Sequence, residues 1–230
     1  MLEFKELKKG ARCYLALKGG FKIDSWLNSY STSIKIGTGG FHGRALKKNY
    51  SILFNVNEDH EGLLKGRNCY ALPWKAGLIW NEEDENSIYV LPGSEWSWLN
   101  EDSKKSFLNE SFVISPTSDK MGYRLNGPSL SKANEEELVS SAVSFGTVQL
   151  LPDGQFIVLM ADHQTTGGYP KIAQVITAHH AALAQMRPDS AVKFALTDNK
   201  TAETLFIKQR RHLLQMENAC KFRLQEFFKN

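Results

Sequence analysis

Short apolar runs rich in β-branched and aromatic residues alternate with segments rich in Gly, Pro and Asn along the first 195 residues. Short runs with such punctuation are typical of β-strands. The pattern predicts strands at residues 11–17, 33–36, 50–56, 87–91, 112–115, 147–151, 156–160, 171–177 and 191–196. Many short strands separated by turns indicate a barrel or a sandwich. The sequence therefore predicts a mainly β fold with minor α content.

The periodicity changes near residue 198, where apolar side chains begin to recur at the spacing of one helix face. They are Ala202, Leu205, Phe206, Leu213, Met216, Ala219, Cys220, Leu224, Phe227 and Phe228. This predicts a long amphipathic helix at residues 198–228, whose apolar face packs on the β domain or contacts another subunit. Shorter helices are expected at 94–108, at 134–140 with Asn134 as N-cap, and at 178–186.

An acidic run at residues 82–85 lies between two strand-rich halves of the chain. Consecutive carboxylates without spaced ligands and a glycine are typical of a solvated linker or turn and not of a cation loop. We expect three parts: residues 1–85, a β domain at 86–197 and the helical segment at 198–230. A turn is expected at 151–155, where Pro152 presets φ and Gly154 accepts a positive φ.

Residues 162–172 form the most informative segment for function, because they read as a polar loop between two strand candidates. Adjacent glycines permit positive φ and leave backbone N–H groups uncovered, which can create a concavity for an anion. Such a loop suits a carboxylate, a carbonyl or a phosphate. A loop that only reverses the chain also favours Gly and Thr, so both readings stand on the residues alone.

Asp162 and Lys171 flank this loop, and Tyr169 lies between them in the sequence. Folding of the loop can bring the carboxylate and the ammonium into one cleft, so these three residues are the candidate catalytic set. The alternative is that Asp162 caps loop amides and Lys171 is solvated. The candidate substrate-binding residues of the loop are Gln164, Thr165, Thr166, Gly167 and Gly168.

Three further residues are candidates for substrate binding outside the loop. Arg124 can hold a carboxylate with two parallel hydrogen bonds, although an ion pair between Asp119 and Arg124 is an equally simple reading. Arg44 ends a glycine-rich loop at 37–44 and can contribute a cation to a cleft. That loop lacks the Gly-Lys-Ser/Thr ending of a nucleotide P-loop, which argues against ATP binding by that mechanism.

Composition excludes several functional classes. The net charge of +3 is too small for a nucleic-acid footprint, and no apolar run is long enough to be a membrane span. Three widely spaced cysteines form no zinc or redox pair, which fits reduced thiols in the cytoplasm. His179 and His180 are adjacent and point in different directions on a helix, so we expect helix-surface or capping roles and no metal site.

Several motifs together resemble the C subunit of bacterial 5-oxoprolinase, also called allophanate hydrolase subunit 2, whose domain also forms half of the carboxyltransferase part of urea carboxylase. The motifs cover most of residues 10–195. They are Gly146-Thr147-Val148-Gln149, Pro152-Asp153-Gly154-Gln155, the loop at 162–172, and the segments at 10–16, 39–46 and 118–125.

Departures from the family pattern are also present. Family members usually begin with an additional segment that this sequence does not match, so we expect the chain to lack the N-terminal part and to be inactive alone. Asn28-Ser29-Tyr30-Ser31-Thr32 lacks the Arg that the family has there. Lys120 stands in place of an Arg, which keeps the charge and loses the planar fork. An acidic residue common near Ser141 is absent.

The resemblance implies a pair of cyclophilin-like β-barrels, the first incomplete, followed by the C-terminal helix. It implies a cytoplasmic hydrolase of a cyclic amide, in which ATP-dependent opening of 5-oxoproline to glutamate involves the A and B subunits of 5-oxoprolinase as partners. An alternative is carboxyl transfer from carboxybiotin to urea or another amide, with biotin carried by another protein because no attachment motif is present. The third is a non-catalytic partner of an allophanate hydrolase subunit 1-like protein that resembles a kinase inhibitor.

Overall fold

The computed structural model describes residues 6, 10–17, 19–55, 87–134, 136 and 138–229, with side chains as far as residue 226. The chain forms two compact units, one of residues 1–12 with 76–230 and one of residues 13–75. The acidic run at 82–85 and Cys69 lie outside the described residues.

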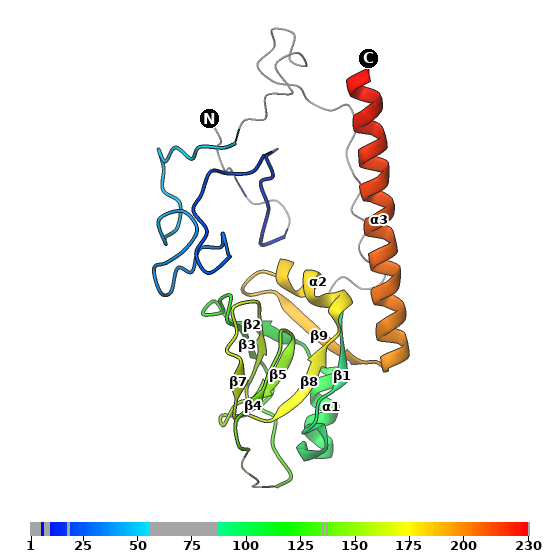
Figure 1. Cartoon of the computed structure of the whole chain (residues 1–230). Coiled ribbons are helices and arrows are strands. Elements are labelled where there is room, and N and C mark those ends of the chain that lie inside the picture. Colours follow the sequence, from blue (N-terminus) through cyan, green and yellow to red (C-terminus); the bar gives the residue numbers. More distant parts are fainter. Residues whose placement is uncertain are drawn as a thin grey trace. The chain divides into compact units, whose positions relative to one another are not determined.

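A closed seven-stranded barrel forms the larger unit's framework among the residues that the structure describes (Figure 1). Around the barrel the order is β1-β8-β5-β6-β3-β2-β9, and the parallel pair β9 and β1 closes it while all other neighbours are antiparallel. The strands are β1 (Ser87–Pro92), β2 (Phe112–Ile114), β3 (Gly122–Asn126), β5 (Thr147–Leu150), β6 (Phe156–Leu159), β8 (Lys171–Val175) and β9 (Ala191–Leu196).

The apolar runs predicted six of these strands, and the mainly β fold is confirmed. The turn at 151–155 is confirmed too, since Leu151 N–H donates to Gln155 O at 2.8 Å and Gly154 has φ of +80°. Strand β3 was missed, because its outward positions are Arg124 and Asn126 and it starts with Gly122. It forms a strand because it lies between β2 and β6 and pairs with both, which its own sequence does not indicate.

Four phenylalanines occupy the centre of the barrel core. Phe112, Phe156 and Phe194 come from three strands, and Phe107 comes from helix α1 (Glu101–Asn109). Their ring centroids lie 4.7–6.3 Å apart. Each fully buried ring contributes on the order of 2 kcal/mol from lost contact with water. The cluster therefore ties α1 to the barrel wall.

The helices are close to the predicted positions, with one exception. The helix expected at 94–108 is a 3-10 turn, η2 (Trp96–Trp98), followed by α1, whose N-cap Asn100 accepts a hydrogen bond from Ser103 N–H at 2.8 Å. Residues 134, 136 and 138–140 are not helical. The segment is short and its carbonyl at Glu136 accepts from Lys132 Nζ, so the helix expected there was wrong.

The C-terminal helix is confirmed as α3 (Asn199–Lys229). Gln209 Nε2 of this helix donates to Ala178 O at 2.7 Å, which joins it to η3 (Thr177–His179), the turn before α2 (His180–Gln185). Leu214 and Phe222 farther along α3 are exposed. None of the helices in the described residues has the length and apolarity needed to cross a membrane.

The strands predicted in the first part of the chain were wrong for the described residues. Residues 11–17, 33–36 and 50–55 contain at most isolated β-bridges, such as Ser33 with Thr38 and Phe21 with Phe54. Tyr14 is 94% exposed and Leu53 is 67% exposed. An apolar run forms a strand only where a neighbouring strand and a core cover it, and these runs have neither within the described residues.

His179 is buried and bonded to strand β1, which corrects the helix-surface role expected from the sequence. Its Nδ1 accepts a hydrogen bond from Tyr89 N–H at 3.1 Å, and its ring stacks on the Tyr89 ring. Burial lowers the pKa of His179 below its usual value of 6.5, although a hydrogen bond with the Ser87 backbone acts in the opposite direction. Burial also lowers the pKa of the neighbouring His180.

We expect the free energy of unfolding to fall as the pH drops below about 6.5. Below that pH His179 and His180 are protonated in the unfolded chain, whereas their lowered pKa values keep them neutral in the folded chain. The loss should reach at most about 1.4 kcal/mol per pH unit for each histidine. Urea denaturation at about pH 7.5 and pH 5.5 measures it. His179→Gln should reduce this pH dependence; an unchanged slope would contradict the assignment.

Candidate functional site

The loop that joins β6 to β8 has to cross β5, because β5 lies between those two strands in the barrel. The crossing is held at both ends. At its start, Asp162 N–H donates to Lys120 O at 2.8 Å, and at its end Leu150 N–H donates to Pro170 O at 2.9 Å. The loop predicted at 162–172 is therefore a cover over one face of β5.

The middle of the loop forms a second, two-stranded sheet. Strand β7 (Thr166–Gly167) pairs with β4 (Ser141–Ala142), and Thr165 O accepts from Val143 N–H at 3.1 Å. We call these paired strands the β4–β7 ribbon. Part of the loop's backbone therefore forms hydrogen bonds within the protein. The Thr-Thr-Gly-Gly stretch does not leave all of its backbone groups free for a ligand.

Gly167 and Gly168 do not adopt the positive φ expected from the sequence. Gly167 instead has no room for a side chain, because an added Cβ would lie 2.5 Å from Gln149 Nε2. An added Cβ at Gly168 would lie 3.3 Å from Ser140 Oγ, a contact that a hydroxyl can relieve by rotation. The glycine at 167 thus permits close approach of the ribbon to β5.

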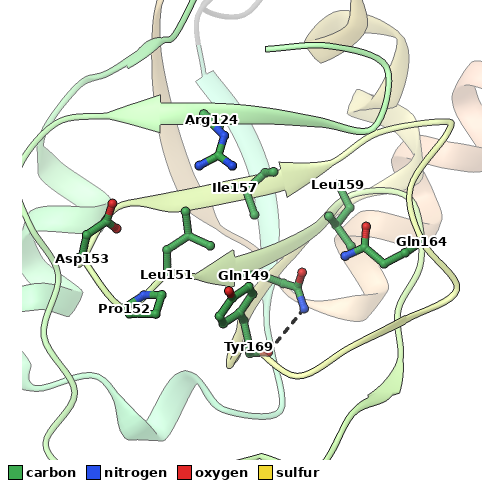
Figure 2. A pocket seen from close by; sticks show the side chains of 9 residues that line it. All are labelled: Arg124, Gln149, Leu151, Pro152, Asp153, Ile157, Leu159, Gln164 and Tyr169. Carbon is green, nitrogen blue, oxygen red and sulfur yellow. Dashed lines mark hydrogen bonds between the residues drawn. The ribbon is translucent and has the colours of Figure 1, made fainter. Parts of the chain in front are cut away.

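A cavity of about 360 Å³ lies beside the loop (Figure 2). This size is within the range of small-molecule sites. Three of its walls come from strands β3, β5 and β6, the rest from the turn after β5 and from the loop. The lining residues are Arg124, Gln149, Leu151, Pro152, Asp153, Ile157, Leu159, Gln164 and Tyr169. We call it the loop cavity.

Strand register aligns four outward side chains into one row across the barrel wall. Arg124 of β3 pairs with Ile157 of β6, Ile157 pairs with Gln149 of β5, and Gln149 pairs with Lys171 of β8. Paired residues in antiparallel strands point to the same face. Two cations therefore flank an apolar side chain and an amide. The four residues come from four separate strands, so their order in the sequence does not show that they are neighbours.

Arg124 is the cation of the loop cavity. Its side chain is exposed, and its guanidinium forms no hydrogen bond or ion pair with any described residue. Figure 2 shows it extending from β3 toward Ile157. The ion pair with Asp119 considered above is not formed, because Asp119 Oδ1 instead accepts from Met121 N–H at 2.7 Å and closes its own turn. Arg124 is thus available to an anionic ligand.

Lys171 lines a different cavity of about 420 Å³, whose wall also includes Ala142 of the ribbon. Its Nζ donates to Ser141 Oγ of β4 at 2.8 Å, and its backbone N–H donates to the buried Glu95 carboxylate at 2.9 Å. Glu95 also accepts from Ser94 Oγ at 2.8 Å. The polar groups around Lys171 therefore largely satisfy one another.

The structure does not bring the candidate pair Asp162 and Lys171 together. The Asp162 carboxylate is exposed, lines neither cavity and forms no hydrogen bond or ion pair with a described residue. Tyr169 and Gln164 do share the loop cavity with Arg124. Thr165, Thr166, Gly167 and Gly168 line neither cavity and support the ribbon.

Arg44 belongs to the other unit and lies over the Tyr50 ring, 5.4 Å from its centroid. Among the described residues, His, Cys, Asp and Glu form no group of three that could hold a metal ion.

Gln149 is the site residue that was missed from the sequence. It is fully buried although it points away from the core, and it forms part of the wall of the loop cavity. Its Nε2 donates to Tyr169 O at 3.4 Å, whereas its Oε1 has no hydrogen-bond partner among the described residues. The sequence did offer one indication, because Gln149 is an amide between Val148 and Leu150 in a strand that belongs to a family motif.

We expect Gly167→Ala to lower the free energy of unfolding by about 1–3 kcal/mol, because the new methyl must displace Gln149 or the ribbon. Gly168→Ala is the matched control and should change it by less than about 1 kcal/mol. Urea denaturation of both variants measures the difference. Equal stability of the two variants would show that Gly167 is not in close contact with Gln149.

Comparison with known proteins agrees with the fold. Residues 1–196 match the family model described as carboxyltransferase domain, subdomain A and B. The C subunits of 5-oxoprolinase from Haemophilus influenzae and Escherichia coli are 36% and 34% identical over 94% of this chain. The chain spans 66% of the length of each of these two relatives.

More distant matches share the fold. The urea amidolyase of Saccharomyces cerevisiae is 25% identical over 89% of this chain and 12% of its own. The crystal structure of the K. lactis urea amidolyase superposes with a TM-score of 0.75 over 93% of this chain and 13% of that one, at 22% identity. The resemblance seen in the sequence is confirmed, and the chain belongs to the carboxyltransferase domain A and B family.

Proposed function

We propose that this chain is part of the C subunit of a 5-oxoprolinase and that the loop cavity binds 5-oxoproline. The relatives that carry this name are 34–36% identical over nearly the whole chain. The observation that carries the proposal is an arginine without a partner among the described residues, in a small cavity beside amide groups. The activity is ATP-dependent hydrolysis of a cyclic amide to glutamate, carried out by the assembled complex.

The chemistry of the cavity suits this substrate. 5-Oxoproline is a five-membered lactam that bears a carboxylate. Arg124 can bind that carboxylate with its planar fork, and the apolar Ile157 beside it in the row can contact the ring. Gln164 and Tyr169 of the loop offer an amide and a phenol as hydrogen-bond donors to the lactam carbonyl. Donors placed at that oxygen stabilise the charge that develops when water attacks.

ATP supplies the phosphoryl chemistry that drives opening of the stable lactam, and we assign its binding to the partner subunits. In this chain, the glycine-rich loop at 37–44 has positive φ at four glycines but lacks the lysine and hydroxyl of a P-loop. The residues of that loop therefore do not fit the phosphate-cradling mechanism. The role of this chain is to bind and orient the lactam.

The relatives that this chain matches are named as C subunits, and we propose the A and B subunits of the complex as its partners. Cys13 and Cys220 are free thiols, which fits assembly in the reducing cytoplasm.

A second candidate function is carboxyl transfer from carboxybiotin to urea or another amide. The family description and the urea amidolyase match favour it. The same cavity would then hold the carboxylated ureido head, delivered by a separate carrier, against Arg124 and Gln164. If the complex hydrolyses ATP in response to 5-oxoproline and does not require biotin, that result favours the first function over carboxyl transfer.

We expect Arg124→Gln to raise the KM for 5-oxoproline in ATP hydrolysis by the assembled complex by about 10- to 100-fold, since a charge-assisted pair with the carboxylate is lost. Lys193→Gln on β9 is the control, because it removes an exposed cation outside the cavity. An unchanged KM in Arg124→Gln would remove the arginine from the site.

We expect Lys171→Ala to lower turnover of the complex without releasing this chain from its partners, because Lys171 pairs with Gln149 and its Nζ donates to Ser141 of the β4–β7 ribbon. Asp162→Ala is the comparison and should leave turnover unchanged, since its exposed carboxylate lines neither cavity. Steady-state ATP hydrolysis with 5-oxoproline and co-purification measure the two effects. Equal turnover of the two variants would exclude a role of Lys171 in the reaction. Intact co-purification with no turnover even in the unaltered complex would favour a non-catalytic partner role.

A further inference from the structure

Four buried side-chain polar atoms in the described residues lack a hydrogen-bond partner, and of these only Gln149 Oε1 belongs to a residue that lines either cavity. Gln149 is 0% exposed, and its Oε1 lacks a hydrogen-bond donor among the described residues. Buried polar atoms in folded proteins nearly always have partners, because desolvation without one costs stability. A buried acceptor in the wall of a cavity is therefore a candidate for a ligand that brings its own donor.

The orientation of the amide is set by its surroundings. The Tyr169 carbonyl can only accept a hydrogen bond, so the side of Gln149 that faces it at 3.4 Å must be the N–H side. Figure 2 shows this contact between the amide and the loop. Gly167 lies close to the same nitrogen, since a Cβ added there would be 2.5 Å from Gln149 Nε2. The oxygen is thereby held on the side away from Tyr169 O.

The register places this acceptor at a fixed spacing from the cation of the same cavity. Arg124 and Gln149 are both partners of Ile157, on the strands to either side of it. Two strand spacings separate their backbones by about 10 Å, and both side chains are outward and long enough to approach each other over Ile157. A ligand between them meets a cation, an apolar floor and a hydrogen-bond acceptor in that order.

We propose that Gln149 determines specificity in the loop cavity by accepting a hydrogen bond from a ring N–H of a ligand whose carboxylate binds Arg124. The inference deepens the proposed function and rests on it. The ligand class is a small cyclic amide with an adjacent carboxylate, in which the N–H and the carboxylate lie on one edge of the ring. A lactone of the same shape presents a ring oxygen to Gln149 Oε1 and is rejected, because two acceptors then face each other.

Gln164 and Tyr169 line the loop cavity together with Gln149, and both belong to the loop, so we call them its rim. Since Gln149 is fully buried, ligand entry has to displace part of that rim. Both rim side chains are exposed, so their displacement breaks few contacts. The loop therefore shields the acceptor from water until a donor replaces it.

The experiment is isothermal titration calorimetry of the assembled complex with 5-oxoproline and with the lactone analogue 5-oxotetrahydrofuran-2-carboxylate. We expect the unaltered complex to bind the lactam at least about tenfold more tightly than the lactone. Gln149→Met, which keeps the shape and removes the acceptor, should bring the ratio close to one. Gln155→Met is the matched control, since the Gln155 side chain bonds only the backbone of Gly127 among the described residues and does not line the cavity; it should keep the ratio.

Thermal unfolding separates this role from a structural one. Because the methionine removes a buried acceptor without a partner, Gln149→Met should unfold at the same temperature as the parent or higher. A clear fall in that temperature would show that Gln149 is a structural residue. The comparison of the two ligands on the unaltered complex needs no variant and remains informative if Gln149→Met fails to fold.

The outcomes for this inference and for the proposed function are distinct. Equal affinity for lactam and lactone in the unaltered complex, or a ratio that survives Gln149→Met, overturns the role of Gln149 and leaves the Arg124 site standing. Absence of binding of both ligands, or binding that Arg124→Gln does not weaken, overturns the proposed function and this inference with it.

Discussion

The burial of β5 on both faces is the constraint on which the site depends. Val148 and Leu150 point into the barrel core, as alternate positions of a half-buried strand should. The other two positions, Thr147 and Gln149, are buried as well: Gln149 lies against Gly167 and Tyr169 of the loop between β6 and β8, and Thr147 bonds Ser144 and Gln174. A cover over the outer face of a barrel strand takes polar side chains out of water.

The two covered side chains meet this constraint differently. Thr147 Oγ1 donates to Gln174 Oε1 at 2.9 Å, and Gln174 Nε2 donates to Phe145 O at 2.8 Å, so that side of the cover is internally satisfied. On the other side Gln149 keeps an oxygen without a partner among the described residues. The satisfied side stabilises the fold, and the unsatisfied side is where a ligand gains the most from binding.

Functional residues in this protein come together through register and not through nearness in sequence. Arg124, Ile157, Gln149 and Lys171 belong to four strands and form one row. Asp162 and Lys171 flank one loop and yet end in different surroundings, because Lys171 lines a cavity beside the ribbon while the exposed Asp162 lines neither cavity. A loop that carries polar residues thus acts here mainly as a cover, while the strands beneath it carry the cation and the amide.

The sequence by itself determined the elements whose signals are local. Apolar periodicity predicted six barrel strands and α3, Pro152 and Gly154 specified the turn into β6, and the motifs identified the family. Only the tertiary structure decided that β3 is a strand, that His179 is buried and that Gly167 contacts Gln149. These features depend on which strands become neighbours and on what covers them, and neither is encoded in the spacing of residues within one segment.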